Sequence, residues 1–174
     1  FDPKRQPNAQ IAENVKLRVT LAPDARLGRR ELRLITPRGI SNPLLFEIGS
    51  WPEHREREPN DKHGGSVLDV DLPLVLNGQI RPGDVDRFRF NARQGQNLVI
   101  DTQARHLVPF LADAVPGWFQ ATLALYDEAG RELAFADDYR FSPDPVMYFR
   151  VPEDGEYVLE IRDAIYRGRE DFVY

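Results

Sequence analysis

The sequence predicts an all-β protein, a jelly-roll β-sandwich preceded by a smaller β segment. Short runs of alternating apolar and polar residues recur along the 174 residues, and turn-forming glycine, proline, asparagine and aspartate residues separate them. No segment combines a helical period with capping residues. Turn residues near position 50 divide the chain into a segment of residues 1–50, a linker of residues 51–61 and a main domain of residues 62–174.

The composition is that of a soluble globular chain with no membrane insertion. Apolar residues make up 41% and charged residues 29%, and no apolar run is long enough to span a bilayer. The formal net charge is −5 with Lys and Arg interspersed among the acids, which argues against a nucleic-acid partner. The absence of cysteine excludes disulfides and thiolate metal sites and identifies no compartment.

Three strands are predicted in residues 1–50. Val15 to Leu21 alternates with period two, with its four apolar side chains facing inward, and the runs Glu31 to Thr36 and Leu44 to Ile48 follow. Three such strands bury too little surface to fold alone, so the segment is expected to need partners.

The motifs Val-Thr-Leu-Ala-Pro-Asp-Ala, Arg-Glu-Leu-Arg-Leu-Ile-Thr-Pro and Gly-Ile-Ser-Asn-Pro-Leu-Leu-Phe lie within residues 14–48. Through them this part resembles the last strands of an immunoglobulin-like module of the type shared by plexins and transcription factors. The resemblance implies a partial immunoglobulin-like β segment whose first strands precede Phe1. The alternative is a plain β-meander packed against the main domain.

Eight further strands are predicted after the linker, with turn sequences such as Asp127-Glu128-Ala129-Gly130 between them. They run over residues 66–70, 74–80, 86–92, 97–103, 121–126, 132–136, 146–151 and 157–162. Alternation directs one set toward the core: Phe88, Phe90, Leu98, Ile100, Leu123, Leu125, Leu133, Phe135, Tyr157, Leu159 and Ile161. It directs Arg87, Arg89, Glu160 and Arg162 toward solvent. Eight short antiparallel strands are typical of a two-sheet sandwich or jelly roll.

A series of motifs extends over residues 56–174. They are Glu58-Pro59-Asn60-Asp61, Leu76-Asn77-Gly78-Gln79-Ile80, Gly83-Asp84-Val85-Asp86-Arg87-Phe88-Arg89-Phe90, Gly95-Gln96, Leu125-Tyr126-Asp127, Ala136-Asp137-Asp138 and Pro152-Glu153-Asp154-Gly155-Glu156-Tyr157. In this order they resemble the bacterial pre-peptidase C-terminal domain, which is related to the collagen-binding domains of bacterial collagenases. The resemblance implies a jelly-roll module attached to an exported peptidase or another large secreted or surface protein.

Oxygen-bearing side chains in the linker suggest a Ca²⁺ site. On an extended segment, Glu56, Glu58 and Asn60 would point their oxygens to one side, and Asp61 would close the end. Several carboxylates that converge without a cation would repel one another. Six to eight oxygens from carboxylates, amides and carbonyls are the ligands that Ca²⁺ requires.

The family resemblance extends this set to a second loop. Calcium-binding relatives hold the ion with the entry segment and the loop before the aspartate-containing strand, which adds Asp84 and Asp86. Gly83 stands where some relatives have an acidic residue. The alternative is a solvated linker in which Arg55 and Arg57 neutralise the glutamates, with the two aspartates shaping a turn.

The apolar stretch from Arg105 to Gln120 is longer than the connection expected in this family. Its Phe110, Trp118 and Phe119, together with Tyr139 and Phe141 from a later turn, would form an aromatic platform for a polysaccharide or a protein ligand. The alternative is that this stretch folds over the open end of the sandwich as core.

No nucleophile elbow, cysteine nucleophile or phosphate-binding loop is recognisable. The sequence therefore predicts a non-catalytic accessory module for adhesion, substrate targeting or domain spacing, with other domains of its parent polypeptide as partners. Its start at Phe1 is interpreted as that of a piece of a longer chain. The resemblance alone implies an exported bacterial protein, whether secreted, periplasmic or on the cell surface. The alternatives are a glycoside- or peptide-hydrolysing enzyme with paired carboxylates, and a structural spacer without a ligand.

Overall fold

The computed structural model describes residues 15–61, 65–68, 71–108 and 118–174, and within these ranges every helix-or-strand element is a β-strand. The all-β prediction is therefore confirmed. The strands are β1 (Gly28–Leu32), β2 (Ile35–Thr36), β3 (Gly39–Ile40), β4 (Leu44–Ile48), β5 (Glu53–Arg55), β6 (Ser66–Val67), β7 (Val75–Asn77), β8 (Val85–Ala92), β9 (Asn97–Asp101), β10 (Ala121–Asp127), β11 (Glu132–Ala136), β12 (Val146–Arg150) and β13 (Gly155–Asp163).

A five-stranded sheet forms the body of the chain, in the order β11-β10-β13-β8-β6. Strands β11, β10, β13 and β8 are antiparallel neighbours, and β6 joins the edge of β8 in parallel. The nine residues of β13 occupy the centre, paired along their length with β10 on one side and β8 on the other.

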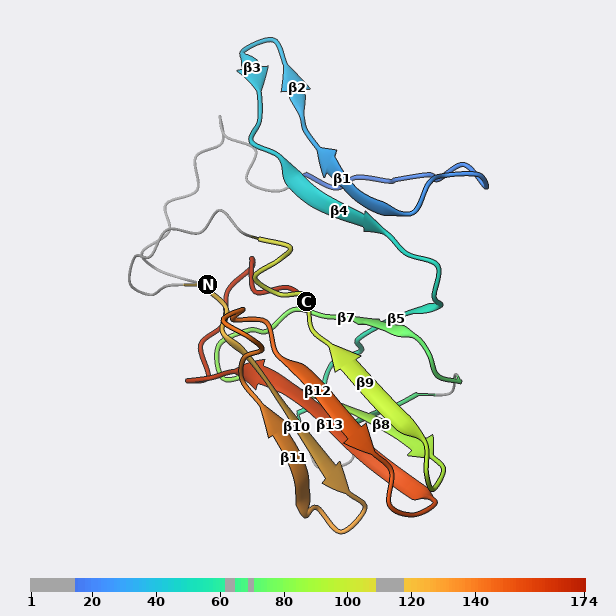
Figure 1. Cartoon of the computed structure of the whole chain (residues 1–174). Helices are drawn as coiled ribbons and strands as arrows, with labels where there is room; N and C mark the ends of the chain where they lie inside the picture. Colours follow the sequence, from blue (N-terminus) through green and yellow to red (C-terminus); the bar gives the residue numbers. More distant parts are fainter. Residues whose placement is uncertain (1–14, 62–64, 69–70, 109–117) are drawn as a thin grey trace.

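Strands β9 and β12 form a two-stranded antiparallel sheet that faces the five-stranded one (Figure 1). Leu98 and Met147 of this pair are buried in the same core cluster as Phe88 of the larger sheet. The ring of Phe149 meets that of Tyr157 edge to face, with centroids 6.2 Å apart. The two sheets therefore share one apolar core, and a jelly-roll path through them stays a prediction.

The predicted core residues are mostly buried. Phe88, Phe90, Leu98, Leu123, Leu125, Tyr157, Leu159 and Ile161 all belong to the buried cluster, and Ile100 and Leu133 pack against it partly buried. Phe135 was assigned wrongly, because 48% of its surface is exposed. It pairs with Ala124 on the sheet face opposite the core, where the bulge between Leu125 and Tyr126 shifts the register of β11.

The predicted solvent orientation of Glu160 is also wrong, because this residue is only 5% exposed. Its carboxylate lies 2.7 Å from Arg87 Nη2 and 3.4 Å from Arg162 Nε. A buried carboxylate needs such partners to offset its lost hydration. The two arginine side chains are themselves only 16% and 19% exposed, so this face of the sheet is partly covered.

Residues 15–48 form two small antiparallel ladders, β1 with β4 and β2 with β3, which extend away from the five-stranded sheet (Figure 1). The strand predicted from Val15 to Leu21 is wrong, because these residues are in no ladder. Their apolar side chains are about half exposed, between 47% and 54%. Alternation alone does not make a strand, since its backbone groups need a hydrogen-bonded neighbour. The division into domains stays a prediction.

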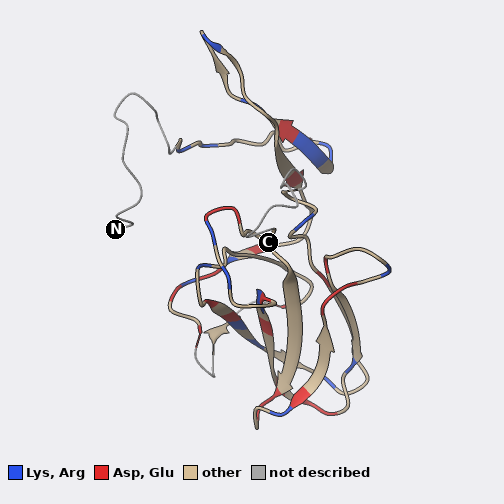
Figure 2. Cartoon of the chain, turned by 90° about the vertical axis from the view of Figure 1, so that its left-hand side faces the viewer, with Lys and Arg blue, Asp and Glu red and all other residues tan. Residues whose placement is uncertain are grey.

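The parallel pair β5 and β7 leads the chain toward the cluster of acidic residues. His54 pairs with Leu76 and Arg55 with Asn77, and the amide of Glu56 then donates to the carbonyl of Asn77 at 2.9 Å. This pairing places residues 56–61 beside residues 78–84, which connect β7 to β8. Along the rest of the chain, Lys and Arg positions are interspersed with Asp and Glu positions (Figure 2).

Candidate metal site

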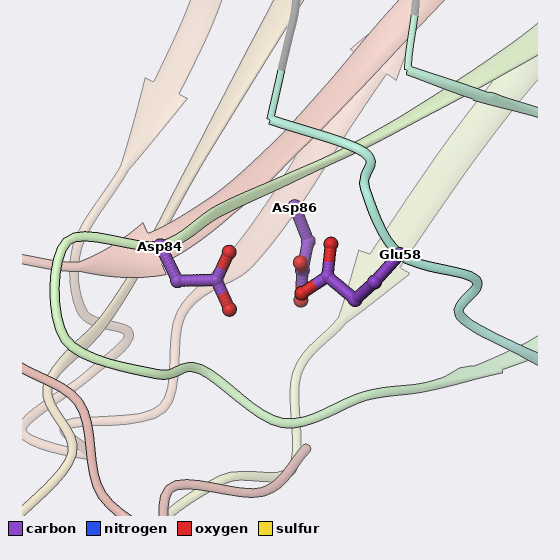
Figure 3. A group of neighbouring side chains, drawn as sticks. All are labelled: Glu58, Asp84 and Asp86. Atoms are coloured by element: carbon purple, nitrogen blue, oxygen red, sulfur yellow. The ribbon is translucent and has the colours of Figure 1, made fainter. Parts of the chain in front are cut away.

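Three carboxylates converge where the linker meets the start of β8. Glu58, Asp84 and Asp86 each offer one oxygen, and these oxygens lie within 4.8 Å of one another. Figure 3 shows the three side chains directed toward a common point from two separate chain segments. Asp86 is completely buried and Asp84 is 7% exposed, whereas Glu58 is exposed. This arrangement of oxygens could hold a metal ion.

The turn from Arg81 to Asp84 orients the Asp84 carboxylate. The amide of Asp84 donates to the carbonyl of Arg81 at 3.0 Å, and Gly83 has the positive φ of +82° that the turn requires. The amide of Arg81 donates back to Asp84 Oδ2 at 3.0 Å, and the amide of Val85 donates to Oδ1 at 3.0 Å. Both oxygens are therefore held by the backbone while they face the cluster.

Asn60 adds an amide to the same place. The side chain of Glu58 accepts a hydrogen bond from the amide of Asn60 at 3.0 Å, and Asn60 is only 2% exposed. Among the residues that the structure describes, neither polar atom of the Asn60 side chain meets a hydrogen-bond partner, and neither does Asp86 Oδ1. Unpaired buried polar atoms are costly, and the two oxygens among these atoms are of the kind that a bound cation would satisfy.

Glu56 and Asp61 flank this centre. The amide of Gln79 donates to Glu56 Oε1 at 2.9 Å, which fixes the glutamate beside Asp86, and the exposed Asp61 interacts with Asp84. Glu56 and Asn60 both act on the Asp86 carboxyl group, and Glu58 lies with Asp84 and Asp86 in the cluster. Among the described residues, neither neighbouring arginine of the solvated-linker alternative, Arg55 or Arg57, forms an ion pair with these glutamates.

The electrostatics of the cluster favour protons or a cation over free negative charge. Burial raises the pKa of Asp84 to about 6, with Asp61, Asp86 and Glu58 adding to the rise against the opposing amide of Arg81. Burial also raises the pKa of Asp86 to about 8, and the neighbouring Glu56 adds to it. Without a cation, Asp86 therefore retains a proton at neutral pH.

Solvent reaches the cluster from one side. A shallow hollow is lined by Glu58 and Pro59 from the linker, Asp61, and the turn from Arg81 to Asp84. Asp86 lies behind these residues, fully buried. An ion entering from solvent would meet Glu58 and Asp84 first, so the site has an access path.

Tyr174 belongs to the cluster and was missed by the sequence analysis. Its hydroxyl donates to Asp86 Oδ2 at 2.6 Å and lies 3.4 Å from Glu56 Oε2. Nothing in its local sequence indicates this position, because it depends on how residues 172–174 pair with residues far away in the chain.

The aromatic residues that the sequence suggested as a binding platform lie in different environments in the structure. Phe119 is 3% exposed and stacks on Phe172 with centroids 5.2 Å apart, so its assignment to a ligand-binding surface is wrong and it is core. Trp118 is partly buried beneath the guanidinium of Arg105, 4.6 Å from its ring centre. Tyr139 and Phe141 are exposed, at 42% and 106%. Phe110 lies outside the described residues.

Within the described ranges, no helix has the length and apolar character needed to cross a lipid bilayer.

Comparison with protein-family models finds no match. Comparison with curated proteins finds a probable subtilase-type serine protease of Deinococcus radiodurans, which is 37% identical over 81 residues. The matched region is 47% of this chain and about a tenth of the length of that relative. The chain is therefore similar to a small part of a bacterial subtilase-type protease.

Proposed function

We propose that this chain is a non-catalytic accessory module of a larger exported bacterial protein, stabilised by a Ca²⁺ ion bound between the linker and the start of β8. Its ligands are Glu56, Glu58, Asn60, Asp61, Asp84 and Asp86, some of them through backbone oxygens. The ion ties residues 56–61 to the edge of the sandwich and thereby stiffens the connection to the preceding segment. The module serves adhesion, substrate targeting or spacing of the other domains of its parent polypeptide.

The observation that carries the Ca²⁺ assignment is a set of buried oxygens that no described residue satisfies. Within the described part of the chain, Asn60 Oδ1 and Asp86 Oδ1 have no hydrogen-bond partner, and they accompany three carboxylates whose oxygens lie within 4.8 Å of one another. Ca²⁺ binds oxygens at about 2.3–2.6 Å and accepts irregular shells of six to eight ligands. Mg²⁺ requires about 2.0–2.1 Å and a near-ideal octahedron, which suits this open arrangement less well.

Two observations support an accessory role over catalysis. The curated relative is a protease by name, and this chain matches only a tenth of it. The described residues form β-strands without a helix, whereas subtilisin-type proteases place their catalytic triad on an α/β scaffold.

Thermal unfolding in 5 mM CaCl₂ against a chelator tests the proposal, with MgCl₂ as the control ion. A ligand that binds only the folded state stabilises it by about 2.7 kcal/mol at one hundred times Kd. We expect a Ca²⁺-dependent rise in Tm for the parent and none for the double variant Glu58→Ala, Asp86→Ala. The matched control is Glu128→Ala, Asp138→Ala, which removes the same two residue types from exposed positions elsewhere.

The outcome separates the alternatives. A Ca²⁺-dependent shift in the parent and the control, lost in the Glu58→Ala, Asp86→Ala variant, supports the site. No shift in the parent, or an equal shift in that variant, leaves a spacer without a ligand as the better description.

A further inference from the structure

Residues 166–174 run alongside the segment that carries the two buried aspartates. The amide of Gly83 donates to the carbonyl of Tyr166 at 3.1 Å, and the amide of Ile80 donates to the carbonyl of Phe172 at 2.8 Å. Gly78 and Tyr174 exchange a reciprocal pair of backbone hydrogen bonds at 3.2 and 3.1 Å. Residues 166–174 therefore brace the backbone between Gly78 and Asp84, directly before Asp86.

Two glycines allow this close packing. A Cβ at Gly168 would overlap the backbone of Arg81 and Pro82, at the start of the turn that orients Asp84. A Cβ at Gly78 would overlap the phenol of Tyr174 and the carboxylate of Glu56. Close contact between residues 166–174 and the metal cluster thus depends on the absence of a side chain at both positions.

Tyr174 reaches the cluster with its hydroxyl. The phenol has one proton to donate, and the 2.6 Å distance assigns it to Asp86 Oδ2, with Glu56 Oε2 at 3.4 Å. Among the described residues Asp86 Oδ1 has no hydrogen-bond partner, and the buried side chain of Asn60 acts on the same carboxyl group.

We infer that Tyr174 is a positioning residue of the ion site. By holding Asp86 Oδ2, its hydroxyl turns Oδ1 toward the cation, and docking of residues 166–174 and ion binding therefore stabilise each other. The inference rests on the proposed Ca²⁺ site and adds an element that supplies no ligand. Hydrogen bonds to the ligands of a metal commonly change its affinity 10- to 100-fold. Because linkage is reciprocal, bound Ca²⁺ strengthens the docking by the factor by which docking strengthens Ca²⁺ binding.

Calorimetric Ca²⁺ titration of the full chain tests the first half of the inference. Tyr174→Phe removes only the hydroxyl, and we expect Kd to rise about tenfold. The matched control is Tyr157→Phe, which removes another buried hydroxyl, bonded at 2.8 Å to the carbonyl of Glu153 far from the cluster, and should keep the parent Kd. Gly78→Ala should also weaken binding, because its methyl would overlap both the Tyr174 phenol and the Glu56 carboxylate; the test of Tyr174 itself therefore rests on Tyr174→Phe.

Amide hydrogen exchange of the parent tests the second half without a variant. The amides of Ile80 and Tyr174 should exchange more slowly in CaCl₂ than in a chelator, whereas the amide of Gly130, in a turn bonded to Asp127, should be unaffected. If the parent binds Ca²⁺ and either effect is absent, this inference is overturned and the proposed function stands. If the parent binds no Ca²⁺, both are overturned.

Discussion

Replacing Asp86 by asparagine should make the metal-free protein more stable at neutral pH, although it removes a residue of the proposed site. Asp86 is fully buried, and burial raises its pKa to about 8, with Glu56 adding to the rise. Asparagine has nearly the same shape, has no charge to bury, and retains an oxygen that accepts the hydrogen bond from Tyr174. The substitution therefore isolates the electrostatic cost of the carboxylate.

The magnitude follows from proton linkage. Between about pH 4 and pH 8 the folded protein keeps a proton on Asp86 that the unfolded chain has released, so unfolding releases a proton. The free energy of unfolding must then fall as the pH rises, by at most about 1.4 kcal/mol per pH unit. Between about pH 4 and pH 7.5 the free energy of unfolding therefore falls by at most about 5 kcal/mol. In a chelator at pH 7.5, we expect Asp86→Asn to be more stable than the parent by roughly 2–5 kcal/mol.

Urea unfolding at pH 5 and pH 7.5, followed by tryptophan fluorescence, measures this difference. The exposed Asp138→Asn serves as the charge-matched control and should follow the parent. Ca²⁺ at one hundred times Kd should raise the free energy of unfolding of the parent by about 2.7 kcal/mol and leave that of Asp86→Asn unchanged. If Asp86→Asn is less stable than the parent in a chelator at pH 7.5, Asp86 is ionised and stabilising without a metal, and the reasoning is refuted.

Three further predictions concern the rest of the molecule. Asp163 is fully buried, and burial alone would raise its pKa, but the hydrogen bonds that it accepts from Arg167 lower it. Asp163→Asn should therefore reduce the free energy of unfolding, measured in urea at pH 7, by about 3 kcal/mol. Because the folded pKa is lowered, this contribution should be lost as the pH falls below about 4. Phe172→Ala should reduce the free energy of unfolding by about 3–5 kcal/mol, because it creates a cavity against Phe119. Phe141→Ala, at an exposed position, should change it by no more than about 0.5 kcal/mol. Equal losses in the two variants would contradict the assigned core. Peptide and glycan substrates should not be turned over by the chain, and turnover abolished by Glu58→Ala would favour the enzyme alternative instead.

The strands of the main sheet could be predicted because local and tertiary preferences agree in them. Strand β11 has the predicted bounds, and β8, β10, β12 and β13 differ from theirs by one or two residues at an end. Their apolar residues alternate, and glycine-containing turns stop them at defined places. Asp127 illustrates this, because its carboxylate accepts the amide of Arg131 at 2.8 Å and closes the turn between β10 and β11.

The errors come from features that depend on what covers a residue. The run from Val15 to Leu21 has a strand pattern but no partner strand. Glu160 lies on the face opposite the core, where alternation predicts exposure, yet two arginines allow it to be buried. For the candidate site, residue types and spacing could indicate the carboxylates, whereas Tyr174 lies 88 residues from Asp86 and could not be connected with it from sequence.

The central place of β13 determines when the fold can be completed during synthesis. Strands β8 and β10 do not pair with each other; β8 pairs with β6 and β10 pairs with β11, and β13 lies between β8 and β10 and joins the two pairs. On the ribosome, which adds about 5–20 residues per second, both strands emerge before the strand that will lie between them. The two strand pairs therefore stay unjoined, with part of their apolar surface uncovered, until residue 163 has left the exit tunnel. Such long-range pairing slows folding, and a nascent chain stalled before β13 would be a natural substrate for chaperones.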